Sequence, residues 1–329
     1  MYEDAQEILK EAEEKEKKIL YWEASQKYEE ALLCFNKLSG YKNEKSLCKK
    51  KIKEMNVQKS KEFLRYSVEL SISEDQESEM KKILNTRDIN ELLNKFGKSP
   101  FFCPSFQEVK KKSANIPLSF LIADFTVQDK NGNPVKNSCD PATVWFYQIY
   151  SLDQLPITHL CLARIFREIM NEKLSALDLC NYFASRQIFS KDFSCYLNVA
   201  IGRFFSGDYI STLHILVPQF ERVLLDLTPK QVPNADTISA GIQKGEKEKV
   251  WTQERIVGEN FLKDENIKRI WGEDFCEQII FVLFSPLGLK LRHKIAHGYV
   301  KPEDLSFENS SLIIYLFLVL FMKTEKKKD

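Results

Sequence analysis

The sequence predicts a mostly helical protein, and three observations lead to that class. Only 11 glycines and 11 prolines occur in 329 residues, too few for a turn-rich all-β chain. From Ala142 onward, apolar residues recur at helical spacing almost without interruption. Residues 1–70 are rich in Lys and Glu and carry a partial apolar stripe of the same period. We therefore expect an all-α protein with two helical parts.

The expected exception is the stretch 97–141, which holds five of the eleven prolines. Asn131 to Pro134 has turn composition, and Phe120 to Val127 before it has β-branched and aromatic character. One small β-hairpin is predicted near residues 120–135. The expected division is an N-terminal helical region (1–96), a connector (97–141) and a helical body (142–329).

Composition excludes several classes of protein. The 48 basic and 47 acidic residues nearly cancel, so any RNA site must be a local basic patch. The eight cysteines form no C-x-x-C pair and have no histidine at metal-ligand spacing, which predicts reduced thiols, no metal site and a cytoplasmic protein. The first residues, Met1 to Asp4, lack the order of a secretion signal. The longest apolar run, Leu312 to Met322, is too short to span a bilayer and predicts a buried helix.

Near the N-terminus, residues 28–43 resemble one tetratricopeptide-like helical hairpin. Ala31 and Phe35 would share one face, and Gly40-Tyr41 would form the turn. One repeat cannot bury its own apolar face, so it should dock on the rest of the chain or on a protein partner. A plain hairpin without a recognition role is an equal alternative.

The helical body contains seven candidate helices. Pro218 should kink the longest of them. The polar, mixed-charge segment Thr228–Lys249 predicts a solvated loop. The candidate helices cover Leu155–Met170, Ala176–Arg186, Asp192–Phe205, Asp208–Leu227, Asp274–Phe284, Gly288–His297 and Ser310–Met322.

The segment Leu289–Tyr299 carries the clearest chemistry. In a helix, Arg292 and His297 would lie within about two turns, near one edge, and His293 would share a face with His297. Gly298 falls where a left-handed C-cap commonly ends a helix. The segment predicts a cationic edge with two proton-exchanging groups.

Side-chain chemistry indicates a phosphodiester ligand for this edge. Arginine matches a phosphate group, and histidine gives or takes a proton near neutrality, so neither a metal nor another cofactor is needed. Lys290 and Lys294 would add positive charge for substrate binding. Glu221 is expected to meet Arg292 or His293 as an orienting carboxylate, since helix bundles project such groups into a shared cleft. An ordinary surface glutamate, and a chance Arg-x4-His pair, are the alternatives.

Residues Arg292 to Gly298 resemble the signature of the HEPN superfamily (higher eukaryote and prokaryote nucleotide-binding domains). The preceding Ser285–Leu289, and Leu213–Arg222 upstream, are similar to a bacterial branch of that superfamily. The resemblance covers roughly residues 175–323. It implies a helical bundle, a homodimer, and in many members a metal-independent ribonuclease whose Arg and His face a symmetry-related pair. Some members bind nucleotides without cutting.

The resulting expectation is an RNA-cutting endoribonuclease without cofactors. Arg292 would bind the scissile phosphate, His297 would act as general base or acid, and His293 would take the second proton role. The resemblance further implies a toxin-like effector in antiviral defence or stress response.

Two questions remain open in the sequence. Tyr299 completes a pattern that resembles the extended motif of HEPN toxins, in which the matching tyrosine is modified with nucleotides, although a packing aromatic is the preferred reading. The alternative functions are a non-catalytic helical interaction or dimerisation protein, and a nucleotide-sensing module.

Overall fold

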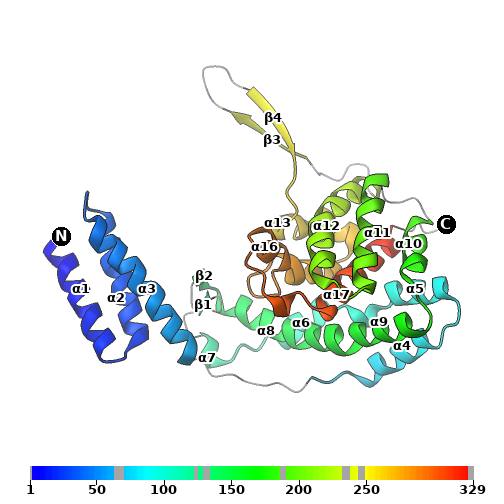
Figure 1. Cartoon of the computed structure of the whole chain (residues 1–329), viewed down its shortest axis with the longest axis horizontal. Helices are drawn as coiled ribbons and strands as arrows, with labels where there is room; N and C mark the ends of the chain where they lie inside the picture. Colours follow the sequence, from blue (N-terminus) through cyan, green and yellow to red (C-terminus); the bar gives the residue numbers. More distant parts are fainter. Residues whose placement is uncertain are drawn as a thin grey trace. The chain divides into compact units, whose positions relative to one another are not determined.

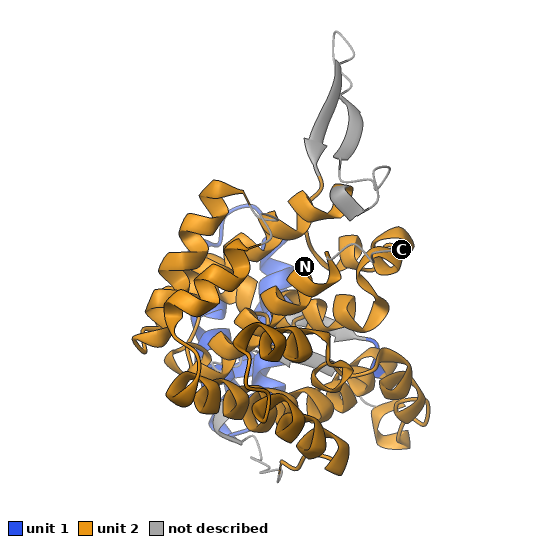
Figure 2. Cartoon of the chain, turned by 90° about the vertical axis from the view of Figure 1, so that its right-hand side faces the viewer, with its two compact units in different colours: residues 1–69, 122–141 blue, residues 70–121, 142–329 orange. Residues whose placement is uncertain are grey.

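The computed structural model describes residues 2–62, 70–121, 125–128, 134–185, 190–231, 238–243 and 249–324. Helices dominate these residues, which confirms the predicted all-α class (Figure 1). The chain forms two compact units: unit 1 comprises residues 1–69 and 122–141, and unit 2 comprises residues 70–121 and 142–329 (Figure 2). The expected boundary at 141/142 coincides with a boundary between the units, whereas the expected boundary at 96/97 falls inside unit 2.

Unit 1 is a three-helix unit with a small hairpin. Its elements are α1 (Tyr2–Lys17), α2 (Tyr21–Asn36), α3 (Lys42–Glu62), β1 (Phe125–Gln128) and β2 (Pro134–Cys139). The two strands pair antiparallel, at the place where the sequence predicted a hairpin. The helices pack in chain order, α1 on α2 and α2 on α3.

Small and aromatic residues together build the core of unit 1. Alanines on α1 and α2 are fully buried and let the helices approach closely, while Tyr28 and Phe35 fill the remaining space. The Tyr28 hydroxyl donates to Glu16 at 2.6 Å, which gives this buried polar group a partner. Ala31 and Phe35 share the buried face as predicted, and Gly40 turns the chain with a φ of 91°.

Unit 2 holds the remaining elements. In chain order they are α4 (Glu74–Leu84), α5 (Ile89–Lys98), η1 (Pro100–Phe102), α6 (Phe106–Lys112), α7 (Leu118–Leu121), α8 (Pro141–Pro156), η2 (Ile157–Leu162), α9 (Ala163–Glu172), α10 (Ala176–Ala184), α11 (Lys191–Phe205), α12 (Tyr209–Gln231), β3 (Ile238–Gln243), β4 (Lys249–Glu254), α13 (Glu259–Leu262), α14 (Glu265–Trp271), α15 (Glu273–Ile279), η3 (Ile280–Phe284), α16 (Leu291–Ala296), η4 (Pro302–Asp304) and α17 (Phe307–Lys323).

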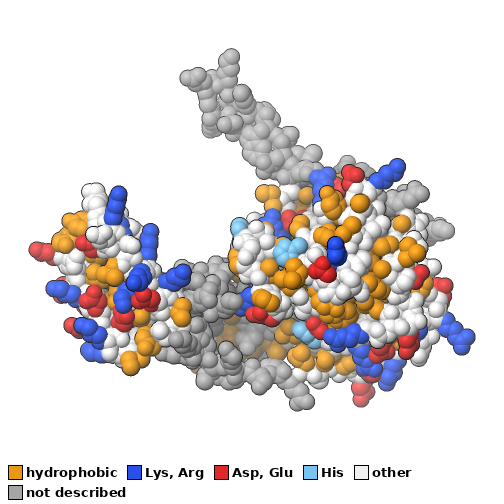
Figure 3. All heavy atoms as spheres, in the orientation of Figure 1, with side chains coloured by type: hydrophobic (Ala, Val, Ile, Leu, Met, Phe, Trp, Pro, Cys, Tyr) orange, Lys and Arg blue, Asp and Glu red, His pale blue; other side chains and the backbone are white. Residues whose placement is uncertain are grey.

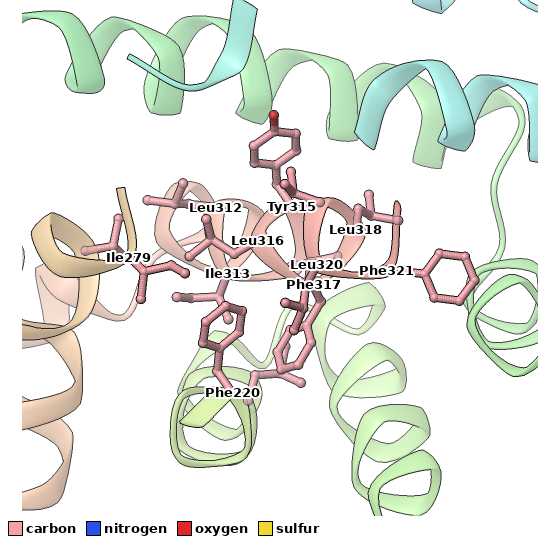
Figure 4. Close-up of a cluster of buried hydrophobic side chains, with 14 of the residues drawn as sticks. Phe220, Ile279, Leu312, Ile313, Tyr315, Leu316, Phe317, Leu318, Leu320 and Phe321 are labelled. Atoms are coloured by element: carbon pink, nitrogen blue, oxygen red, sulfur yellow. The ribbon is translucent and has the colours of Figure 1, made fainter. Parts of the chain in front are cut away.

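Helix α17 is the centre of unit 2. All residues from 309 to 322 are buried, as expected for a helix that is apolar on every side. Figure 4 shows Tyr315 and Phe317 leaving this helix in opposite directions, with Phe220 of α12 below it. The predicted buried helix at Leu312–Met322 is confirmed. In the part of the chain that the structure describes, no helix is both long and apolar enough to cross a membrane.

Helix α12 extends on both sides of Pro218, so the proline does not end it. One feature of unit 2 differs from the sequence prediction. The predicted loop Thr228–Lys249 is wrong, because α12 continues to Gln231 and is followed by the antiparallel strands β3 and β4. The charged run of this segment suggested a solvated loop, but Val250, Trp251 and Thr252 after it are β-branched or aromatic residues that favour a strand.

Helices α8 and α15 each continue directly into a π-helical segment. The segments η2 and η3 are π-helical, with hydrogen bonds that span five residues instead of four. The first begins directly after Pro156, which has no N–H to continue the α-helical pattern. The second ends where the chain turns toward the candidate site.

Candidate functional site

The turn that follows η3 fixes the start of the candidate site. Ser285 N–H donates to the Ile280 carbonyl at 2.8 Å, and Leu289 N–H donates to the Phe281 carbonyl at 2.9 Å. The second bond draws the chain so close to η3 that a Cβ at Gly288 would lie 2.1 Å from the Phe281 oxygen. Only glycine allows this approach.

The helix of the motif is shorter than the predicted Gly288–His297. It begins after Lys290, whose left-handed φ of 53° keeps that residue out of the helix, and it ends at Ala296. A six-residue helix has less than two turns, so its neighbours hold it in place. Leu291 is fully buried and anchors its first turn.

The end of α16 has the predicted left-handed cap. Gly298 has a φ of 68°, its N–H donates to the Ile295 carbonyl at 3.2 Å, and Tyr299 N–H donates to the Lys294 carbonyl at 3.0 Å. This pair of bonds is the Schellman motif, which satisfies the last carbonyls of the helix. It also folds Tyr299 back toward the residues of α16.

Two imidazoles and a phenol form a cluster at this end of the helix. The rings of His293 and His297 have centroids 4.3 Å apart, and Tyr299 lies 5.6 Å from the first ring and 6.2 Å from the second. The predicted common face of His293 and His297 is therefore present. His297 and Tyr299 are exposed, whereas His293 is half-buried.

The environment of His293 favours its neutral form. Burial lowers its pKa below the ordinary 6.5, and the positive charges of Lys290, His297 and Arg292 lower it further. A neutral imidazole can accept a proton, which is the property a general base needs at neutral pH.

Arg292 forms an ion pair with a residue of another helix, α12. Its Nε donates to the Oε1 of Glu221 on α12 at 2.7 Å, so the contact expected from the sequence is present. Arg292 thus joins α16 to α12, whereas the ring contacts of His297 are with His293 and Tyr299.

The lysines of the segment differ in their partners. Lys294 Nζ donates to the Oδ1 of Asp304 at 2.9 Å. Lys290 forms no ion pair with any residue that the structure describes, and burial together with the charge of Lys294 lowers its pKa. Asp304 was not foreseen from the sequence; it also accepts at Oδ2 from Lys301 N–H, three residues before it, at 3.2 Å.

No family model, curated protein or solved structure matches this chain. Two adjacent imidazoles, bordered by cations, can transfer protons at a bound anion. Histidine side chains are visible at the surface of unit 2 in Figure 3. Within the described ranges, no group of three or more His, Cys, Asp or Glu residues is arranged to hold a metal ion.

A hollow of about 650 Å³ lies elsewhere in unit 2 and was not foreseen from the sequence. Phe101, Leu152 and Ile157 contribute apolar lining, and Asp75 and Glu108 contribute carboxylates. It contains no histidine, so it lacks the proton-transferring groups of the α16 cluster.

The carboxyl of Glu221 predicts a pH-dependent stability. Burial raises its pKa above the ordinary 4.5, and the bond from Arg292 offsets this only in part. Its contribution to stability is therefore complete below pH 4.5 and is lost as the pH rises through the raised pKa. Relative to Glu221→Gln, the wild type should lose free energy of unfolding as the pH increases from about 4 to about 8. Urea unfolding of both proteins across that range tests this, and a constant difference between them would contradict it.

Proposed function

We propose that this protein is a metal-independent endoribonuclease of the HEPN type that cleaves RNA through attack by the ribose 2′-hydroxyl. The observation that carries the proposal is the contact of His293 with His297, whose ring centroids are 4.3 Å apart on a partly exposed face bordered by Lys290. Each of the two imidazoles can carry out one of the two proton transfers that the reaction requires.

The half-buried His293 suits the role of general base. In its neutral form it takes the proton of the 2′-hydroxyl while the 2′-oxygen bonds to phosphorus. The bond from phosphorus to the 5′-oxygen breaks, and an imidazolium gives that oxygen its proton. The products are a 2′,3′-cyclic phosphate and a 5′-hydroxyl, and the exposed His297 is the candidate acid.

The spacing of the two rings supports a homodimer. At 4.3 Å the rings touch, so no phosphate group fits between His293 and His297 of one chain. The attacking and leaving oxygens of a phosphoryl transfer lie roughly in line, so base and acid must act from opposite sides of phosphorus. Two copies facing each other across a groove would provide the base from one protomer and the acid from the other.

The wider role follows from the resemblance described above. We propose a cytoplasmic, toxin-like effector in antiviral defence or stress response. Unit 1 would recognise a protein partner, and its exposed Trp22 and Leu33 are apolar residues suited to a contact surface.

One observation favours a second candidate, a non-catalytic interaction protein. The bond between Arg292 and Glu221 is what a structural ion pair between two helices would show. In that case α16 would only stabilise unit 2 or bind a nucleotide.

Incubation of the purified protein with total RNA in the presence of a chelator distinguishes the candidates. The ribonuclease should elute as a dimer from a sizing column and leave fragments with 2′,3′-cyclic phosphate ends. A monomer that leaves the RNA intact would contradict the proposal and favour the interaction protein.

A further inference from the structure

The three cations of the motif segment differ in how much positive charge they offer to a ligand. Arg292 is paired with the carboxylate of Glu221 at 2.7 Å, and Lys294 is paired with Asp304 at 2.9 Å. Each pair is close to neutral as a unit. Lys290 forms no ion pair with any described residue and keeps its charge uncompensated. An incoming anion would therefore be attracted most strongly to Lys290.

The backbone of Lys290 gives a second, independent observation. Its φ of 53° lies in the left-handed region, which is costly for residues other than glycine. In unit 2, it is the one non-glycine residue with a positive φ among those that the structure describes. Strained residues of this kind concentrate at binding and catalytic sites, where the strain fixes the direction of a side chain.

The charge of Lys290 also acts on the imidazole cluster. Among the neighbouring charges that lower the pKa of His293, Lys290 has the largest effect, ahead of His297 and Arg292. The half-buried ammonium group is thus the cation most strongly coupled to the proposed base. A bound phosphate would relieve the repulsion between these two groups.

We propose that Lys290, and not Arg292, is the residue that binds the phosphate group of the ligand beside His293. Arg292 is then a positioning residue, which holds α16 on α12 through Glu221. The ligand class is a phosphate monoester or diester, and its identification with RNA rests on the proposed ribonuclease function.

Inorganic phosphate is the first probe, and the chain has only four histidines to report on it. Imidazole NMR signals of His293 and His297 should shift on titration with phosphate. Lys290→Gly removes the charge and accepts the positive φ, and it should weaken phosphate binding by about tenfold or more. Lys290→Arg should retain binding. Lys95→Gln, which removes an exposed lysine of α5 that is paired with Glu91 at 2.8 Å, is the matched control and should change the affinity less than about twofold.

A single-stranded 2′-deoxy oligonucleotide, which cannot be cleaved by this chemistry, is the second probe. Loss of one phosphate contact should reduce the slope of log K against log salt concentration by about 0.7. Lys290→Gly should show this reduction, and Lys95→Gln should not.

The possible results test the assignment of Lys290 separately from the proposed ribonuclease function. Equal effects of the two substitutions, no effect of Lys290→Gly, or failure of Lys290→Arg to bind phosphate would each overturn the assignment of Lys290. If the wild type leaves RNA intact but binds phosphate through Lys290, the ribonuclease proposal fails and the anion site stands.

Discussion

Replacing His293 or His297 with alanine is expected to lower RNA cleavage by about 100- to 10,000-fold, the usual contribution of a general acid or base. Both rings lie at the C-terminal end of α16, and neither belongs to the buried core. The thermal unfolding temperature should therefore change little. Single-turnover cleavage of a labelled RNA, with unfolding curves of the same samples, measures both effects.

The pH profile gives a more specific test of His293. Burial and nearby positive charges lower its pKa below 6.5, and the base must be neutral to act. Wild-type cleavage should therefore fall on the acid side with a midpoint below pH 6.5, and His293→Ala should lose this limb.

His214→Ala is the matched control for both histidine variants. His214 is exposed on α12 and its Nδ1 contacts the Ile210 carbonyl of its own helix at 2.8 Å. Its removal should leave cleavage unchanged. Equal activity of His293→Ala, His297→Ala and His214→Ala would contradict the proposed roles of the two site histidines.

Gly288→Ala should destabilise the protein by about 3 kcal/mol, the upper part of the range for overpacking. The added Cβ would lie 2.1 Å from the Phe281 carbonyl oxygen, a backbone atom that already accepts the bond from Leu289. The turn must then open and release α16 from η3. Urea unfolding measures the loss of stability, and RNA cleavage should decrease in the same variant.

Gly202→Ala should change the stability of the protein in the opposite direction. Gly202 lies inside α11, and a Cβ there would meet nothing within 4 Å. The substitution should stabilise the protein by about 0.5–1 kcal/mol through helix propensity alone. A Gly288→Ala variant as stable as the wild type would show that the turn after η3 tolerates a side chain.

Local signals in the sequence were sufficient to predict many of the helices and where they end. The apolar spacing predicted a helix at Asp192–Phe205, and α11 covers Lys191–Phe205. The glycine at position 298 marked the left-handed end of α16, because few other residues adopt that conformation. The contact between Glu221 and Arg292 followed from placing two polar groups inside one bundle.

Features that depend on tertiary contacts could not be predicted from such local signals in the sequence. Nothing in the composition distinguishes Lys290 as a residue with positive φ, because the bond between Leu289 and the Phe281 carbonyl imposes the path of the chain. The hairpin of β3 and β4 was not predicted, because the charged run Lys244–Lys249 is typical of a solvated loop and β3 contains only two β-branched residues.

The π-helical bonding of η3 determines which carbonyl remains available where the chain leaves its helix. In ordinary α-helical bonding the Ser285 N–H would donate to the Phe281 carbonyl, whereas here it donates to the Ile280 carbonyl. The Phe281 carbonyl is thereby left to accept from Leu289 N–H, the bond that draws Gly288 against η3. The turn that leads into α16 therefore depends on a bonding pattern set by buried apolar residues of η3, at a distance in sequence from every histidine of the site.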